Sequence, residues 1–71
     1  MTKAKKARLT LGLNIEEMSR LVGVHRQTWA KWEHGERNLT AAPSRLLDVI
    51  LWMHSRGLIG DFLRDFRKKT P

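Results

Sequence analysis

The sequence predicts an all-α fold, a compact five-helix domain that occupies the whole chain, residues 1–71. Glycines stand at positions 12, 23, 35 and 57, and each follows a stretch of apolar residues with helical spacing. No segment alternates apolar and polar residues as a half-buried strand does. A chain of 71 residues forms a thin core, so its helices must pack closely or gain stability from a partner subunit.

The first two predicted helices have clear ends. The first spans Lys3 to Leu11, with its basic residues opposite the apolar ones, and Gly12 ends it. The second follows Asn14, a good N-cap, and carries Glu16 and Glu17 in its first turn, where carboxylates interact favourably with the helix dipole. The apolar stripe of this second helix consists of Ile15, Met18, Leu21 and Val22.

The third predicted helix extends from about His25 to His34 and carries two tryptophans, Trp29 and Trp32. Their spacing of three residues places both indoles on one face, and we expect that face to pack into the core. The outer face and the N-terminal end of this helix are then formed by His25, Arg26, Gln27, Thr28, Ala30 and Lys31.

The fourth predicted helix starts near Thr40–Ser44 and ends near Arg56, and the fifth carries apolar residues from Leu58 to Phe66. The run LLDVILWM at 46–53 is apolar almost all round, which predicts burial on several faces. The fifth helix covers one of these faces, and a partner subunit is the simplest cover for another; a fully covered monomer is the alternative. We therefore expect residues 41–67 to form a dimer interface through Trp52, Met53, Leu58, Phe62 and Phe66.

Residues 14–34 combine into a helix-turn-helix pattern, in which two short helices flank a tight turn. Gly23 stands at the turn, where a left-handed backbone is favourable only for glycine. Ser19 stands where the two helices cross, and a small side chain lets them approach. The outer face of the second of these helices suits the major groove of DNA, since Arg and Lys bind guanine, Gln binds adenine and small apolar groups contact the thymine methyl group.

The stretch from about Arg8 to Leu47 resembles the Cro and phage-repressor family of helix-turn-helix proteins, the xenobiotic-response-element type. The matching residues are LGLNIEEMSRLVGV, HRQTWAKWEHGER, and a proline before a leucine-rich fourth helix. The resemblance implies a lambda-repressor-like domain that binds a palindromic DNA operator as a homodimer and represses transcription. Three positions depart from the family pattern. Trp29 stands where Val or Ile is usual, Ser19 replaces the usual Ala, and Leu39 stands where many members have Pro. We therefore expect a bulkier core and a different loop path after Gly35.

The resemblance also implies roles for single residues. Positions that commonly read bases are matched by Arg26, Gln27 and Lys31, with van der Waals contacts added by Thr28 or Ala30. Phosphate contacts are expected from Asn14 and His25 at helix N-termini, from Arg37 and Asn38 in the loop after the third helix, and from Lys5 in the basic first helix. Glu33 matches a structural position that pairs with a basic residue of the first helix, such as Arg8.

The charge balance agrees with a polyanionic partner. Fourteen Lys and Arg residues against seven Asp and Glu residues give a net charge of +7, and nucleic acid is the commonest polyanion that a small protein meets. A basic surface that serves only solubility is the alternative. Basic residues gather at both ends of the chain: Lys3, Lys5, Lys6, Arg8, Arg64, Arg67, Lys68 and Lys69.

Other classes of protein are disfavoured. The chain has no cysteine, its three histidines lack the spacing of a metal site, and no nucleophile–base pair or phosphate-binding loop is present. We therefore expect no metal, no cofactor, no small-molecule substrate and no enzymatic activity. No apolar run approaches the ~20 residues that span a bilayer, so we expect a cytoplasmic protein near the nucleoid of a bacterial or phage-infected cell.

Two rival functions stay open. Exposed tryptophans would suit a module that binds single-stranded nucleic acid by stacking. An antitoxin-like or adaptor chain would bind another protein through the fourth and fifth helices, with or without DNA. Repression of its own promoter is expected by analogy with small phage regulators, antitoxins and anti-CRISPR-associated autorepressors, and the sequence does not choose among them.

Overall fold

The computed structural model describes the backbone of residues 1–69 and the side chains of residues 1–66. Five helices form the described chain, in agreement with the predicted all-α class: α1 (Lys3–Leu11), α2 (Ile15–Val22), α3 (Arg26–Glu33), α4 (Ala41–Ser55) and α5 (Gly60–Lys69). One boundary differs from the prediction. His25 and His34 flank α3 as its N-cap and C-cap and do not belong to the helix.

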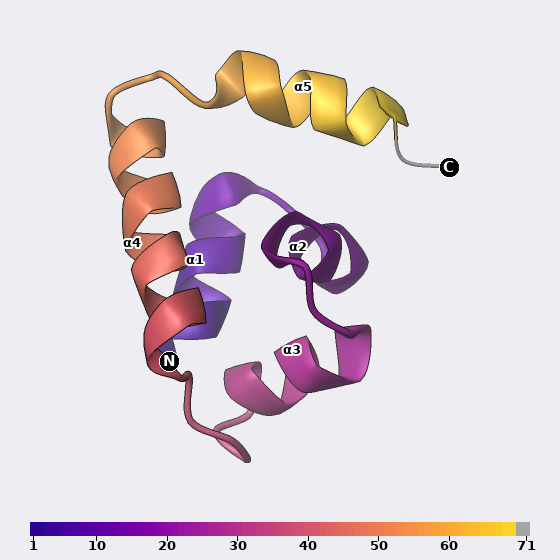
Figure 1. Cartoon of the computed structure of the whole chain (residues 1–71), viewed down its shortest axis with the longest axis vertical. Coiled ribbons are helices and arrows are strands. Elements are labelled where there is room, and N and C mark those ends of the chain that lie inside the picture. Colours follow the sequence, from indigo (N-terminus) through magenta and orange to yellow (C-terminus); the bar gives the residue numbers. More distant parts are fainter. Residues whose placement is uncertain (70–71) are drawn as a thin grey trace.

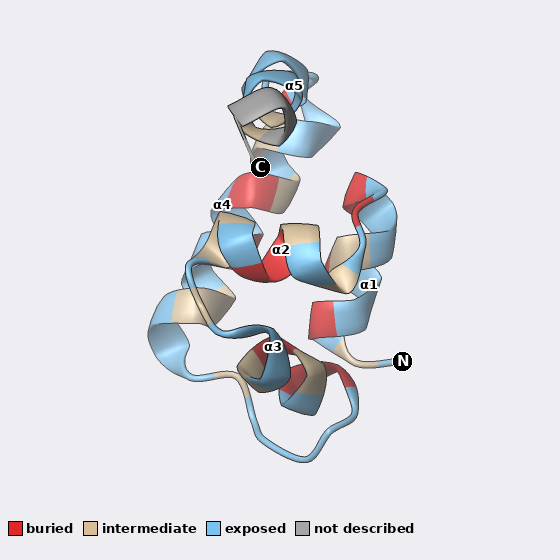
Figure 2. Ribbon diagram, turned by 90° about the vertical axis from the view of Figure 1, so that its right-hand side faces the viewer, coloured by how far each residue is buried: buried red, intermediate tan, exposed pale blue. Residues whose placement is uncertain are grey.

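The five helices pack around one core. In Figure 1, α4 and α1 lie side by side, and α3 contacts both α1 and α2. Both views place α5 across the end of the molecule that is opposite α3 (Figures 1 and 2). The helix predicted to read DNA and the last helix of the predicted dimer interface are therefore at opposite ends of a molecule of 32 × 28 × 20 Å.

Trp29 lies at the centre of the core. The core is formed where α1 to α4 face one another, and its largest inaccessible side chains are Trp29, Met18 and Leu47 (Figure 2). Trp32 is only 6% exposed and meets Trp29 edge to face, with 5.8 Å between the ring centroids. Both indoles face inward, as their spacing predicts.

The α2–α3 turn forms as the sequence predicts. Asn14 Oδ1 accepts a hydrogen bond from the Glu17 backbone at 2.8 Å, and Glu17 Oε1 accepts one from the Asn14 backbone at 3.0 Å, which makes a capping box. Gly23 ends α2 with a φ of +85°, and the backbone N–H groups of Gly23 and Val24 donate to the Ser19 carbonyl oxygen. Ser19 itself is buried, so a small residue does occupy this position.

α5 covers the end of α4 only in part. Ile59 is buried and Leu63 packs against the core, whereas Phe62 is 53% exposed. Phe62 and Phe66 stack on each other with 6.1 Å between their ring centroids. The last helix therefore leaves apolar surface open to solvent beside α4.

Candidate nucleic-acid interface

The outer face of α3 carries polar side chains without partners. Arg26, Gln27 and Lys31 are exposed, while Thr28 and Ala30 are half-buried beside them. Among the side chains that the structure describes, those of Arg26, Gln27 and Lys31 take part in no hydrogen bond or ion pair. The inward indoles thus leave an available row of donors and acceptors on the opposite face of the helix.

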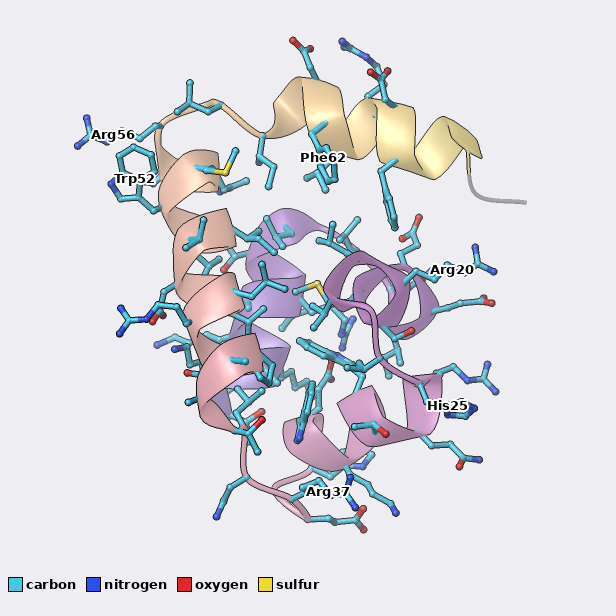
Figure 3. The ribbon with its side chains drawn as sticks, viewed as in Figure 1. Arg20, His25, Arg37, Trp52, Arg56 and Phe62 are labelled. Atoms are coloured by element: carbon cyan, nitrogen blue, oxygen red, sulfur yellow. The ribbon has the colours of Figure 1, made fainter. Side chains whose placement is uncertain are left out.

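His25 begins this helix as its N-cap. The Nδ1 atom of His25 accepts a hydrogen bond from the Gln27 backbone N–H at 3.1 Å. Because Nδ1 accepts this bond, Nε2 is the ring nitrogen that can donate to a partner. Figure 3 shows His25 at the outer edge of α3, on the same side of the molecule as Arg20.

An ion pair between the buried Glu33 and the half-buried Arg8 fixes the other end of α3. The Glu33 carboxylate accepts hydrogen bonds from Arg8 Nε at 2.6 Å and Nη2 at 3.1 Å, and from the Trp29 indole N–H. Arg8 also donates to the Leu13 carbonyl oxygen at 3.2 Å, and the Thr2 hydroxyl group donates to the Glu33 carbonyl oxygen at 3.0 Å. These bonds tie α1 to α3 and confirm the Arg8–Glu33 pairing that the family resemblance implies.

The ion pair shifts the titration of both partners. Burial raises the pKa of the Glu33 carboxyl group, but the hydrogen bonds from Arg8 and Trp29 and the charge of Arg8 outweigh it, so the pKa lies below its ordinary value. The hydrogen bond to Glu33 raises the pKa of the Arg8 guanidinium group. Both groups are therefore charged at neutral pH, and α3 is held by a pair of opposite charges.

The expected phosphate-binding residues surround α3 on several elements. The side-chain oxygen of Asn14 is engaged in the capping box, whereas its side-chain NH₂ group can still donate to a phosphate. Arg37 and Asn38 are exposed in the loop after α3, and Figure 3 shows Arg37 at that end of the molecule. Lys5 is exposed on α1, and its charge acts on Glu33. The side chains of the predicted basic C-terminal end, Arg67, Lys68 and Lys69, lie outside the described residues.

A shallow groove separates the start of α2 from the outer face of α3. We name it the Ile15–Ala30 groove; it has a volume of about 440 Å³ and is lined by Asn14, Ile15, Glu16, Arg26, Gln27 and Ala30. The sequence pattern assigns Ile15 to the core stripe of α2, yet the side chain is only half-buried and also lines this groove. The sequence does contain an indication of this exposure: Ile15 is the first residue of α2 after the N-cap, at the very end of the helix.

Two further charged residues of α2 lie beside α3. Glu16 and Arg20 are exposed and form an ion pair at 3.2 Å, with the i,i+4 spacing that the sequence contains. Together with His25 and Arg26 they line a second hollow, between the side of α2 and the start of α3. The sequence predicts Glu16 only as a favourable partner of the helix dipole, and it does not distinguish Arg20 from any other residue of a solvated helix face.

A helix-turn-helix family model matches residues 5–47, from α1 into α4, which is more than half of the chain. The chain belongs to the Cro and phage-repressor type of helix-turn-helix family. No curated protein and no solved structure matches it. Membership of this helix-turn-helix family identifies the protein as a DNA-binding transcription regulator.

From the end of the segment that matches the helix-turn-helix family onward, exposed apolar side chains occur on α4, on the loop that follows it and on α5. We name these side chains the α4–α5 apolar surface, which extends over more than one flank of α4: Leu46, Val49, Trp52, Met53, Leu58 and Phe62. Met53 and Phe62 share one groove of about 230 Å³ with Leu46 and Val49. Trp52 lies under the Arg56 guanidinium group, 5.2 Å from its carbon to the ring centroid, on the outer side of α4 (Figure 3). Of the predicted interface residues, the structure thus brings Met53 and Phe62 together, and Trp52 lies on another flank of α4.

Neither a metal site nor a membrane span is found in this helix-turn-helix protein within the part that the structure describes. No three His, Asp or Glu side chains gather there as metal ligands would. The described helices include none with the length and apolar character needed to cross a bilayer.

Proposed function

We propose that the protein is a transcriptional repressor that binds a palindromic duplex operator as a homodimer and represses its own promoter. The observation that carries the proposal is the outer face of α3. Arg26, Gln27 and Lys31 are exposed there and have no partner within the described residues, while Trp29 and Trp32 hold the opposite face in the core.

In this mechanism α3 enters the major groove. Arg26 and Lys31 donate to guanine, and Gln27 forms paired hydrogen bonds with adenine. Phosphates are contacted by Asn14, His25, Arg37, Asn38 and Lys5, which surround α3. These phosphate contacts supply most of the affinity, and the contacts of α3 supply the discrimination between sequences. Occupation of an operator that overlaps a promoter then excludes the polymerase.

The α4–α5 apolar surface supports a second subunit. Phe62 and Trp52 are both more than half exposed, and burial of such aromatic side chains stabilises interfaces. Because α5 and α3 lie at opposite ends of the molecule, two copies can bury this surface and leave both recognition helices free. A two-fold dimer then places its recognition helices in successive major grooves, ~34 Å apart.

The same surface favours one second candidate, an antitoxin-like or adaptor role in which α4 and α5 bind another protein. Co-purification of a stoichiometric partner protein would favour that role. A module that stacks single strands on Trp29 and Trp32 has no support, because both indoles are buried.

Selection from a random duplex library with the full chain tests the proposed function. We expect one palindromic motif with half-sites roughly 10 base pairs apart, centre to centre. The double variant R26A/Q27A serves as the matched control, and it should enrich no common sequence while still binding duplex DNA weakly. Failure of the wild type to enrich any duplex, or equal competition by single strands, would contradict the proposal.

A further inference from the structure

We infer that the Ile15–Ala30 groove binds the 5-methyl group of a pyrimidine at the major-groove edge of DNA, the group that thymine and 5-methylcytosine share. The inference rests on the proposed function, because it requires α3 in the major groove. It adds Ile15, a residue of α2, to the residues that determine which sequence is bound.

The floor of the groove is apolar. Ile15 and Ala30 are both half-buried, and Ile15 also packs against the core, which fixes its position. Most of the accessible surface in the groove belongs to carbon atoms. Ala30 follows Arg26 by four residues on α3, so it lies one helical turn further along the same face. An apolar floor beside a row of base-reading donors suits an apolar group carried on a base.

The rim of the groove argues against a phosphate as its ligand. On the α2 side, the Glu16 carboxylate carries a negative charge. Glu16 pairs with Arg20, but no cation of α2 lines the groove itself. A phosphate on the floor of the groove would meet apolar carbon beside the Glu16 carboxylate, with Arg26 on the far rim as the one cation among the described lining residues, whereas a methyl group there carries no charge and loses no hydrogen bond.

The chemistry of the major groove indicates which bases can supply this apolar group. The exposed edges of the four bases carry donors and acceptors, and thymine alone adds a methyl group. 5-Methylcytosine presents a methyl group at the same ring position. Gln27 and Arg26 on the opposite rim provide polar contacts to the neighbouring atoms of the same or the adjacent base pair.

Replacement of thymine by deoxyuridine in the selected operator tests the inference, because uracil keeps the base pairing and lacks only the methyl group. Each thymine of a half-site is replaced in turn, symmetrically in both half-sites. We expect one position at which wild-type binding weakens about fourfold per half-site, the factor for burial of one methyl-sized group.

Ile15→Thr and Ile15→Val form a matched pair for this test, since valine and threonine have nearly the same shape and similar helix propensities. The valine variant should keep most of the thymine preference, and the threonine variant should bind the thymine and uracil operators equally. Circular dichroism and thermal unfolding of both variants check that they fold alike. Equal thymine preference in the two variants would overturn the assignment of the methyl group to this groove.

A further arm compares cytosine with 5-methylcytosine at the sensitive position. Tighter binding of 5-methylcytosine would show that the groove takes the methyl group on either base, and equal binding would assign it to thymine alone. A wild-type protein that selects an operator but is indifferent to every thymine methyl group would overturn the inference and leave the proposed function intact. Failure to select any duplex would instead contradict the proposed function.

Discussion

Glu33 lies on the buried side of α3, yet its bonds hold the helix that presents Arg26 and Gln27 to solvent. Its carboxylate joins Arg8 of α1 to the Trp29 indole, and it is almost fully buried. The Glu33→Gln substitution leaves the guanidinium group of Arg8 without its counter-charge, which costs roughly 3 kcal/mol for a buried pair. We expect the free energy of unfolding, measured in urea at pH 7, to fall by about that amount. Glu16→Gln, which breaks an exposed pair, should change it by less than about 1 kcal/mol.

The same residue gives the stability a defined pH dependence. Because the folded-state pKa of Glu33 is lowered, its stabilisation is fully present above the unfolded pKa of about 4.3 and is lost as the pH falls through the folded pKa. Between pH 5 and pH 3 the wild type should therefore lose more unfolding free energy than Glu33→Gln does. Parallel curves for the two proteins would show that Glu33 makes no contribution to this loss.

Arg26 and Gln27 carry the prediction for sequence discrimination. Each side chain is exposed at the first turn of α3 and is free to form paired hydrogen bonds with a base. Arg26→Ala or Gln27→Ala should cost ~1–3 kcal/mol of binding free energy on the selected operator and relax the preference at one base pair. Gel-shift titrations over single-base operator variants measure both effects. Full retention of sequence preference by both variants would show that α3 is not the reading helix.

At the scale of elements, the backbone of Gly23 determines how α2 meets α3. A Cβ atom at Gly23 or at Gly60 would meet nothing within 4 Å, but Gly23 has a φ of +85° while Gly60 lies in ordinary helical backbone. Gly23→Ala should therefore destabilise the fold by about 1 kcal/mol, because alanine is strained in the left-handed region. Gly60→Ala should stabilise it by up to about 1 kcal/mol. Thermal unfolding of the two variants compares them, and shifts in the same direction would contradict the argument.

The helices could be predicted closely from the sequence because their ends depend on local chemistry. Asn14 with Glu17 starts α2, and Gly12 and Gly23 end α1 and α2 where the sequence places them. The Ile15–Ala30 groove could not be predicted in this way. It depends on how the start of α2 lies across α3, and the helical periodicity of Ile15 indicates only that its side chain is near the core.

At the scale of the whole molecule, the α4–α5 apolar surface carries the prediction of dimerisation. We expect the wild type to sediment as a dimer and Phe62→Ser to weaken the dimer by about 2 kcal/mol or more, because exposed aromatic residues often anchor interfaces. Leu9→Ser is the control, since Leu9 is 50% exposed on α1 and does not belong to this surface. Equal dimer dissociation constants for the two variants would exclude Phe62 from the interface.

Because the molecule is positively charged, we expect its affinity for DNA to depend on the salt concentration. Lys5→Ala and Arg37→Ala should each weaken binding to all duplex sequences alike and reduce the slope of log affinity against log salt by about one. Arg56→Ala is the control, because Arg56 lies beside Trp52, away from His25 and Arg37 (Figure 3). A salt slope that changes equally in all three variants would mean that the phosphate contacts are not localised around α3.

The global features differ in how far the sequence predicts them. The all-α class, the inward indoles and the Arg8–Glu33 pair follow from periodicity and from the family resemblance. The net charge indicates a polyanionic partner but not which cations stay unpaired, and Arg20 and Lys3 turn out to have acidic partners. The apolar run at 46–53 predicts an uncovered face, yet only the folded chain shows that Leu46 and Val49 share it with Phe62.

Of the three tryptophans of the chain, Trp29 and Trp32 have buried indoles on the inner face of α3, and Trp52 has an exposed indole on α4. An aqueous fluorescence quencher therefore reaches Trp52 far more readily than Trp29 or Trp32. The part of the emission that a quencher removes reports on α4, and the part that resists the quencher reports on the core packing of α3. The unmodified protein thus carries one optical signal from the α4–α5 apolar surface and a separate one from the packing beneath the outer face of α3.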